Sequence, residues 1–278
     1  MNPFDFPFLQ RGFAAVALLA PLLGALSHLV VARRLAFLST ALGQAALTGL
    51  TLGLALGEPI SAPYGGMFGF CLLAALAMVW LKRRSALPAD TLIGVFVAFT
   101  LGLSICLLVA VTQRFNVHQI EALMFGSLLT VTAGDLALLA ALLVLAGLFL
   151  ARRWNALLQD SVAPATTPMA AGERTRLDYL FVLLLTATIV ASLKIVGALL
   201  VEAWVVIPAA AARQVARSLR QQVAWSIALA LLGGFAGLLL STWFTVPTGG
   251  AVVLALAVLF VVCTALGALR GGAQRRGR

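Results

Sequence analysis

Glu202 is an acidic residue within a long apolar stretch, residues 195–212. An ionised carboxylate inside a lipid bilayer costs roughly 2.5 kcal/mol or more unless it faces water or a partner. One interpretation is therefore a polar path in which this carboxylate binds a cation or a cationic group. The other is a structural partner for Lys194, or for backbone donors near a helix break. Both interpretations stay open at the level of the sequence.

Two histidines and three cysteines are further side chains of the kind that binds metal ions. His118 precedes Glu121 by three residues, and one helical turn would bring them to a common face as a weak metal site. With two ligand types alone, a solvated loop pair is the favoured interpretation. His28 lies in an apolar run and is interpreted as buried and hydrogen-bonded. The cysteines are far apart in apolar runs, and we interpret them as core or lipid-facing residues: Cys71, Cys106 and Cys263.

The elements that carry these side chains must be membrane helices. The chain has 278 residues, of which 62% are hydrophobic and 10% charged, compared with about 25% charged in an ordinary soluble domain. Its polar pieces are too short for a catalytic or nucleic-acid-binding domain with its own core, which excludes a soluble enzyme with a membrane tail. The net charge of +10 comes from Lys and Arg at the ends of apolar runs, so nucleic acid is not an expected partner.

The apolar runs predict nine transmembrane helices and an all-α membrane fold. When the nine spans are threaded alternately, 16 of the 19 positive charges fall on one side, which the positive-inside rule makes cytoplasmic. The N-terminus is then expected outside and the C-terminus inside. Residues 113–134 are expected to form an outer loop and a short interfacial or re-entrant helix. The predicted spans are residues 12–32, 35–57, 65–81, 91–112, 135–151, 177–193, 195–212, 223–243 and 249–269.

Two prolines are expected to interrupt helices. Pro208 lacks a backbone donor and should kink the seventh span. Pro247, followed by Gly249 and Gly250, should break the chain before the last span. Broken helices expose backbone groups along transport paths, and tight turns have the same composition. We therefore predict that these residues shape the path, without assigning them a ligand.

Five segments of the sequence follow one another in a recognisable order. They are RRLAFLSTALGQAALTGLTLG at 33–53, DTLIGVFVAFTLGL at 90–103, LMFGSLLTVTAGDL at 123–136, VGALLVEAWVVIPAAAAR at 196–213 and GLLLSTWFTVPTGGAVVL at 237–254. In order and spacing the chain resembles the membrane permease subunits of bacterial ABC importers for zinc, manganese and iron. The resemblance implies the second importer type, similar to the vitamin B12 permease, with a translocation pathway at the axis of a homodimer.

The resemblance also implies the partners of the chain. Two ATP-binding cassette subunits would dock on its cytoplasmic loops, and an external solute-binding protein would deliver the substrate. The permease itself would have no catalytic residues and no cofactor, because ATP and magnesium would bind to the partner ATPase. The sequence has no Gly-x-x-x-x-Gly-Lys-Ser/Thr phosphate loop, which agrees with an energy source outside this chain.

The first of the five segments departs from the family pattern. Where the family has aspartate and histidine four residues apart, on one helix face that ligates a metal dication, this chain has Thr40 and Gln44. Neutral oxygens can line a hydrated path but are poor ligands for a bare Zn²⁺ or Mn²⁺ ion. Either the metal path is rebuilt, with Glu202 as a replacement, or the cargo differs. Ordinary helix packing by small polar residues is the alternative.

Residues 154–178 form the longest segment on the predicted cytoplasmic side, and within it the stretch from Asp160 to Gly172 corresponds to the coupling helix of the resembled family. Asp160, Ala170 and Gly172 loosely match the acidic residue, small residue and glycine of that family. Two prolines lie between them, so the helix is expected to be broken or to start late. We expect this segment to dock on the ATPase; a passive connector is the alternative.

The sequence therefore predicts a single transmembrane permease domain over residues 1–278, located in the inner membrane of a bacterium. Its expected activity is translocation of a transition-metal ion, zinc or manganese, by ATP-driven alternating access. Membrane lipid and a second copy of the chain are further expected partners. Two alternatives stay open. One is the same importer architecture with a chelated metal or a small organic solute as cargo, and the other is a membrane scaffold without transport.

Overall fold

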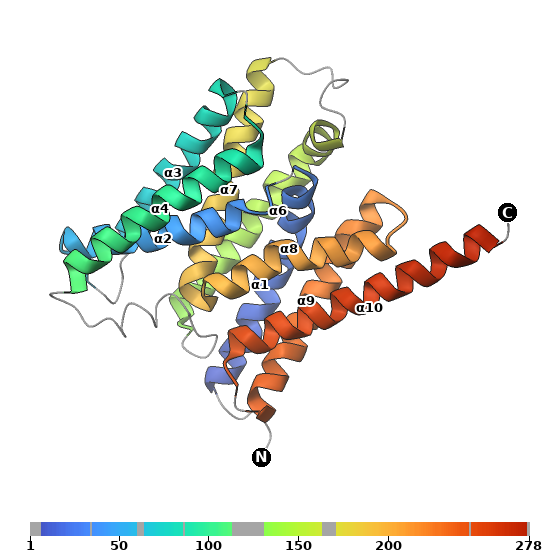
Figure 1. Cartoon of the computed structure of the whole chain (residues 1–278). Coiled ribbons are helices and arrows are strands. Elements are labelled where there is room, and N and C mark those ends of the chain that lie inside the picture. Colours follow the sequence, from blue (N-terminus) through green and yellow to red (C-terminus); the bar gives the residue numbers. More distant parts are fainter. Residues whose placement is uncertain are drawn as a thin grey trace. The chain divides into compact units, whose positions relative to one another are not determined.

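The computed structural model describes residues 7–33, 35–59, 64–85, 87–112, 131–162, 171–244 and 246–276. All secondary structure within these residues is helical (Figure 1), so the predicted all-α fold is confirmed. The helices are α1 (Pro7–Ala32), α2 (Leu38–Ala55), α3 (Tyr64–Arg84), α4 (Ala89–Thr112), α6 (Ala133–Val162), α7 (Ala171–Val196), α8 (Ala198–Val215), α9 (Leu219–Phe244) and α10 (Thr248–Arg276).

Within the described part of the chain, eight helices are long and apolar enough to cross a membrane. The helix outside this group is α8, which has 18 residues and carries both Glu202 and Arg213. Helix α6 continues well past the predicted end of the fifth span at residue 151, because it includes the first part of the expected coupling segment. Most of residues 113–134, where we expect a short interfacial or re-entrant helix, lie outside the described residues.

Local sequence explains where two of the helices begin. Before α6, the Asp135 carboxylate accepts hydrogen bonds from the Thr132 backbone N–H and hydroxyl at 3.1 and 2.7 Å, and Asp135 N donates to Thr132 Oγ1 at 3.2 Å. Before α9, Gln221 N donates to Ser218 Oγ at 3.3 Å. Such pairs satisfy backbone donors that have no partner in the first turn of a helix. Both starts are therefore determined by residues three positions apart.

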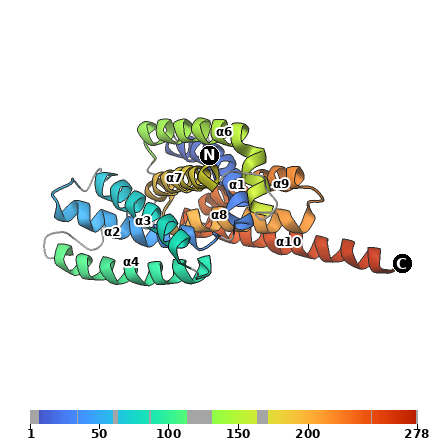
Figure 2. The same ribbon diagram turned by 90° about the horizontal axis from the view of Figure 1, so that it is seen from above.

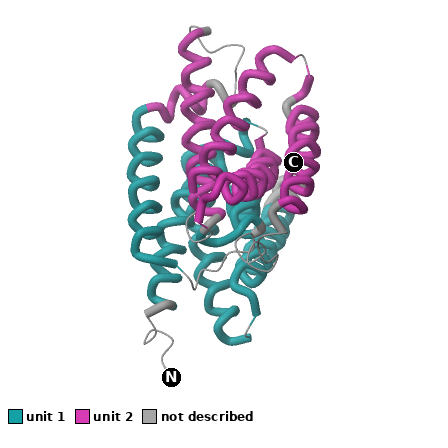
Figure 3. Tube along the Cα trace, turned by 90° about the vertical axis from the view of Figure 1, so that its left-hand side faces the viewer, with its two compact units in different colours: residues 1–33, 127–152, 195–278 teal, residues 34–126, 153–194 magenta. Residues whose placement is uncertain are grey.

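The chain folds as two compact units (Figure 3). Unit 1 contains residues 1–33, 127–152 and 195–278, and unit 2 contains residues 34–126 and 153–194. In unit 1, α10 packs along α8 and α9, and α1 packs against α8 and α9 (Figure 2). In unit 2, α2 packs against both α3 and α4. The prediction of one permease domain over the whole chain stays a prediction.

Close helix contacts and buried hydrogen bonds hold unit 1 together. The side chain of Trp204 on α8 is fully buried, and its Nε1 donates to the backbone oxygen of Ala230 on α9 at 3.2 Å. A Cβ at Gly234 would come within 2.8 Å of the Trp204 ring. Ser226 Oγ on α9 donates to the Gly24 carbonyl of α1 at 2.8 Å. Small residues thus bring the helices close, and each of these polar groups meets a backbone carbonyl.

Helices α2 and α3 touch backbone to backbone in unit 2. A Cβ at Gly66 would lie 2.7 Å from Gly53 Cα, and a Cβ at Gly49 would lie 2.9 Å from Met67 Cα. The carboxylate of Glu58 lies at the same crossing, where its two oxygens accept a hydrogen bond from Gly66 N at 3.0 and 3.2 Å. A carboxylate near the start of a helix is favoured by the helix dipole. The α2–α3 pair is therefore fixed by glycines and one acidic cap.

Candidate functional site

Thr40 and Gln44 lie one helical turn apart on α2 of unit 2, and both are half-buried. Thr48 continues the row by another turn and is fully buried. Its hydroxyl lies 3.0 Å from the Gln44 carbonyl of its own helix and 3.0 Å from the Thr100 carbonyl of α4, and donates to both. The spacing of four residues places the three side chains on one face of α2. This row of neutral oxygens begins in the half-buried part of the helix and ends at the contact with α4.

Helix α4 carries another hydroxyl group nearer its C-terminal end. Ser104 lies one turn beyond Thr100, is fully buried, and its Oγ has no hydrogen-bond partner among the described residues. Thr100 differs, because its Oγ1 donates to carbonyls of its own helix at 2.9 and 3.1 Å. A buried hydroxyl without a partner is costly. Ser104 therefore offers a donor and an acceptor to water or to a bound molecule.

Glu202 lies in α8 of unit 1 and is half-buried. The same helix contains Pro208, which is buried and does not end it, since α8 continues to Val215. One residue after the proline, Ala209 N donates to Ser27 Oγ of α1 at 3.2 Å. Proline removes a donor and disturbs the helical hydrogen bonds around it. The Ser27 hydroxyl of α1 thus accepts a hydrogen bond from the backbone next to Pro208.

A single residue separates α7 from α8. Gly197 has a φ of 84° and a ψ of 163°, a combination that is essentially restricted to glycine because a Cβ would clash with the backbone. Val201 N donates to the Gly197 carbonyl at 3.3 Å, which begins the hydrogen bonding of α8. The carboxylate of Glu202 therefore lies one turn after a junction that requires glycine.

Pro247 lies in the connection between α9 and α10, immediately before the first residue of α10. Its carbonyl accepts a hydrogen bond from Ala251 N at 3.1 Å. On the preceding side, Ser241 Oγ donates to the Val246 carbonyl at 2.7 Å. A proline fits this place because the first backbone donors of a helix have no internal partner. The break predicted before the last span corresponds to this connection.

The candidate pathway residues belong to different units: Thr40 and Gln44 to unit 2, and Glu202 to unit 1. Within the described ranges no three His, Cys, Asp or Glu side chains are grouped so that they could hold a metal ion. His28 is buried in α1, whereas the predicted pair of His118 and Glu121 lies outside the described residues. A bare transition-metal ion prefers imidazole, thiolate or carboxylate ligands.

The expected coupling segment is described at both of its ends. Asp160 lies near the end of α6, Gly172 is exposed near the start of α7, and Ala170 lies outside the described residues. Arg153 Nη1 and Glu173 Oε1 are 3.5 Å apart, and the two side chains are both 51% exposed. This ion pair joins the last part of α6 to the first turn of α7.

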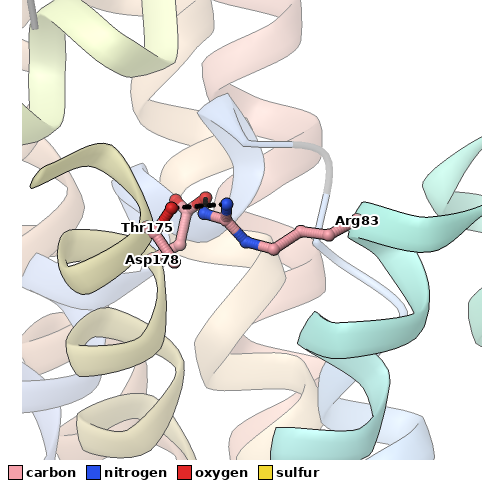
Figure 4. A network of polar contacts seen from close by, with 3 residues as sticks. All are labelled: Arg83, Thr175 and Asp178. Atoms are coloured by element: carbon pink, nitrogen blue, oxygen red, sulfur yellow. Dashed lines mark hydrogen bonds and ion pairs between the residues drawn. The ribbon is translucent and has the colours of Figure 1, made fainter. Parts of the chain in front are cut away.

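A second polar contact joins α7 to α3 (Figure 4). Arg83, in the last turn of α3, donates to Thr175 Oγ1 at 2.6 Å and to Asp178 Oδ2 at 3.2 Å. The guanidinium carbon also lies 5.8 Å from the centre of the Tyr179 ring. Sequence reasoning missed this network, because the residues are more than ninety positions apart and no local pattern pairs them. The one available signal was the charge of Arg83 at a helix end.

Comparison with known proteins identifies the family. Residues 5–267 match the ABC 3 transport family. The chain is 31% identical over 257 residues to the high-affinity zinc uptake system membrane protein ZnuB of Haemophilus influenzae, covering 92% of this chain and 95% of that protein. It is 28% identical over 258 residues to the manganese import system permease protein ScaB of Streptococcus gordonii, covering 93% and 91%.

A solved structure has the same fold. PsaBC from Streptococcus pneumoniae in complex with Fab matches with a TM-score of 0.77 and 26% sequence identity, and the match covers 93% of this chain and 91% of that one. Together with the eight apolar helices, these relatives confirm the predicted multi-pass location in a membrane. The chain therefore belongs to the ABC 3 transport family and is a membrane permease of an ABC transporter, as the resemblance implied.

Proposed function

We propose that this chain is the permease subunit of an importer in the bacterial inner membrane that moves a transition-metal ion, zinc or manganese. The match of residues 5–267 to the family is the observation that carries the proposal, and relatives named for zinc uptake and manganese import support the cargo. In this proposal two copies of the chain form the pathway and two ATP-binding cassette subunits, which hold ATP and magnesium, drive alternating access. An external solute-binding protein delivers the ion.

The chain's own contribution is a path through the membrane. In this proposal Glu202 supplies a negative charge that attracts a cation, and the half-buried Thr40 and Gln44 supply neutral oxygens that replace part of the water shell of the ion. Such oxygens hold a dication weakly, and weak binding permits rapid release. Asp160, Ala170 and Gly172 belong to the segment that docks on the ATPase, and Pro208 and Pro247 shape the path.

A second candidate cargo is a chelated metal or a small organic solute. The specific observation in its favour is that Thr40 and Gln44, both half-buried on α2, offer neutral hydrogen-bonding groups rather than metal ligands.

One experiment separates the two cargoes. The permease is reconstituted in vesicles with its ATPase and binding protein, and ATP hydrolysis and uptake are measured with Zn²⁺, Mn²⁺, Fe²⁺ and their chelates. Uptake of one free ion supports the metal importer. Uptake of a chelate alone supports the second cargo, and no stimulation by any of these ions or chelates contradicts the metal importer in both forms.

The role of Glu202 has its own test. Glu202→Gln removes the charge and keeps the size, so we expect loss of uptake while assembly with the ATPase is retained. Asp90→Asn is the matched control, because it removes an exposed carboxylate in the first turn of α4. Normal uptake by Glu202→Gln would show that the carboxylate has a structural role.

A further inference from the structure

We propose that Arg83 is a positioning residue that transmits movement of the coupling segment to α3 and α2. The inference rests on the proposed function, since it assumes that the ATPase acts on residues 154–178. It concerns the contact of Figure 4, which neither the pathway nor the docking residues explain. The contact lies entirely within unit 2.

The sequence places complementary side chains on α3 and α7 at this contact. Thr175, Asp178 and Tyr179 are spaced by three and four residues, which places them on one face of α7. Arg83 is in the last turn of α3, where the helix dipole favours a cation, and Asp178 lies two turns into α7. The opposite charges attract each other, and Arg83 also stabilises the end of its own helix.

The geometry favours arginine over lysine at position 83. Two nitrogens of the Arg83 guanidinium reach two acceptors, Thr175 Oγ1 at 2.6 Å and Asp178 Oδ2 at 3.2 Å. The centre of the Tyr179 ring lies 5.8 Å from the central carbon of the same guanidinium. A planar group with several fixed donors holds such an arrangement, whereas the single ammonium of lysine does not. The side chains of Arg83 and Asp178 are 35% and 28% exposed, so the pair is partly shielded from water. It is thus more directional than an isolated surface ion pair.

A continuous set of contacts leads from this network to the candidate pathway. The Arg153–Glu173 pair joins the residue immediately before the coupling segment to the first turn of α7, and Arg83 joins the first part of α7 to α3. Helix α3 is in backbone contact with α2 at Gly66 and Gly49, and α2 carries the Thr40 and Gln44 row. Because helices in backbone contact cannot slide without losing packing, a displacement of α7 that pulls on Arg83 moves α3 and α2 together.

The test compares transport with ATP hydrolysis in the same vesicles, using the complete complex with Mn²⁺ and Zn²⁺ as probes. We expect R83Q to lower the ions imported per ATP hydrolysed about tenfold, which is a typical allosteric coupling effect, while assembly and basal ATP hydrolysis are retained. The matched control is R84Q, because Arg84 is the next residue and stacks on Trp80 of its own helix, 5.4 Å from the ring centre. The charge swap R83D/D178R is expected to recover part of the lost coupling.

Three outcomes would overturn the inference. They are an unchanged transport-to-ATP ratio in R83Q, an equal loss in R84Q, and a loss of ATP hydrolysis in parallel with uptake. If R83Q does not assemble, D178N takes its place, because it keeps an acceptor but removes the charge, and failure of both to assemble would make the network a stability element. Inactivity of the wild-type complex would instead overturn the proposed function itself.

Discussion

Replacing Gly66 by alanine is expected to destabilise unit 2, because α2 and α3 are in backbone contact at this residue. A Cβ at position 66 would lie 2.7 Å from Gly53 Cα and 2.8 Å from Gly53 N, whereas carbon atoms in contact are normally about 3.5–4.0 Å apart. The obstacle is backbone, so no change of rotamer relieves it. The two helices must separate by roughly 1 Å, which weakens the packing along their whole contact.

The magnitude follows from a matched pair on one helix. Overpacking of this kind costs about 1–3 kcal/mol. A Cβ at Gly69, also on α3, would meet open space, so Gly69→Ala is expected to be neutral or to stabilise by about 0.5–1 kcal/mol through helix propensity. The two variants should therefore differ by about 1–4 kcal/mol in the free energy of unfolding. At about 2–4 °C per kcal/mol, the difference in Tm is about 2–16 °C.

The assay is thermal unfolding of the purified permease in detergent, in which the fraction that stays monodisperse is measured after heating to a series of temperatures. Gly49→Ala approaches the same contact from α2 and should resemble Gly66→Ala. If Gly66→Ala and Gly69→Ala had the same Tm, the reasoning from close backbone contact would be refuted.

Two other predictions concern the surroundings of Glu202. Gly197→Ala places a Cβ on a residue with φ of 84° and should lower the free energy of unfolding by about 1–3 kcal/mol. The control Gly172→Ala, at an exposed helical position with open space, should leave Tm unchanged. Equal Tm values for the two variants would contradict the strain at Gly197. Ser27→Ala removes the hydroxyl that accepts a hydrogen bond from Ala209 N and should lower the free energy of unfolding by about 1 kcal/mol. Thermal unfolding measures this loss, and the control is Thr264→Val, whose exposed hydroxyl bonds a carbonyl of its own helix. No difference between these variants would show that the Ser27 contact contributes nothing.

Much of the architecture could be predicted from the sequence. Helices follow from apolar runs because backbone groups in a bilayer must be satisfied within each segment, and eight of the predicted spans correspond to helices apolar enough to cross. The start of α6 follows from Thr132 and Asp135. The family could be inferred from the five sequence segments, because their order and spacing can be read along the chain.

The candidate site was less accessible from the sequence. Thr40 and Gln44 are visible as a departure, and their common face follows from helical spacing. The bonding of Thr48 to Thr100, 52 residues away, has no local sign. The same is true of Ser27, which bonds the backbone beside Pro208 from a distant helix. A serine or threonine in a membrane helix is compatible with packing, capping or ligand binding.

The membrane class, the helices and their polar interruptions follow from the order of the residues, because hydrophobicity and helical periodicity act over one turn or one span. Which helices meet depends on the folded structure. Only the folded chain brings Gly66 against α2, and only the folded chain brings Arg83 within 2.6 Å of Thr175. These contacts depend on the docking of helices through small residues and on the opposite charges of Arg83 and Asp178, and neither requirement can be recognised from the spacing of neighbouring residues.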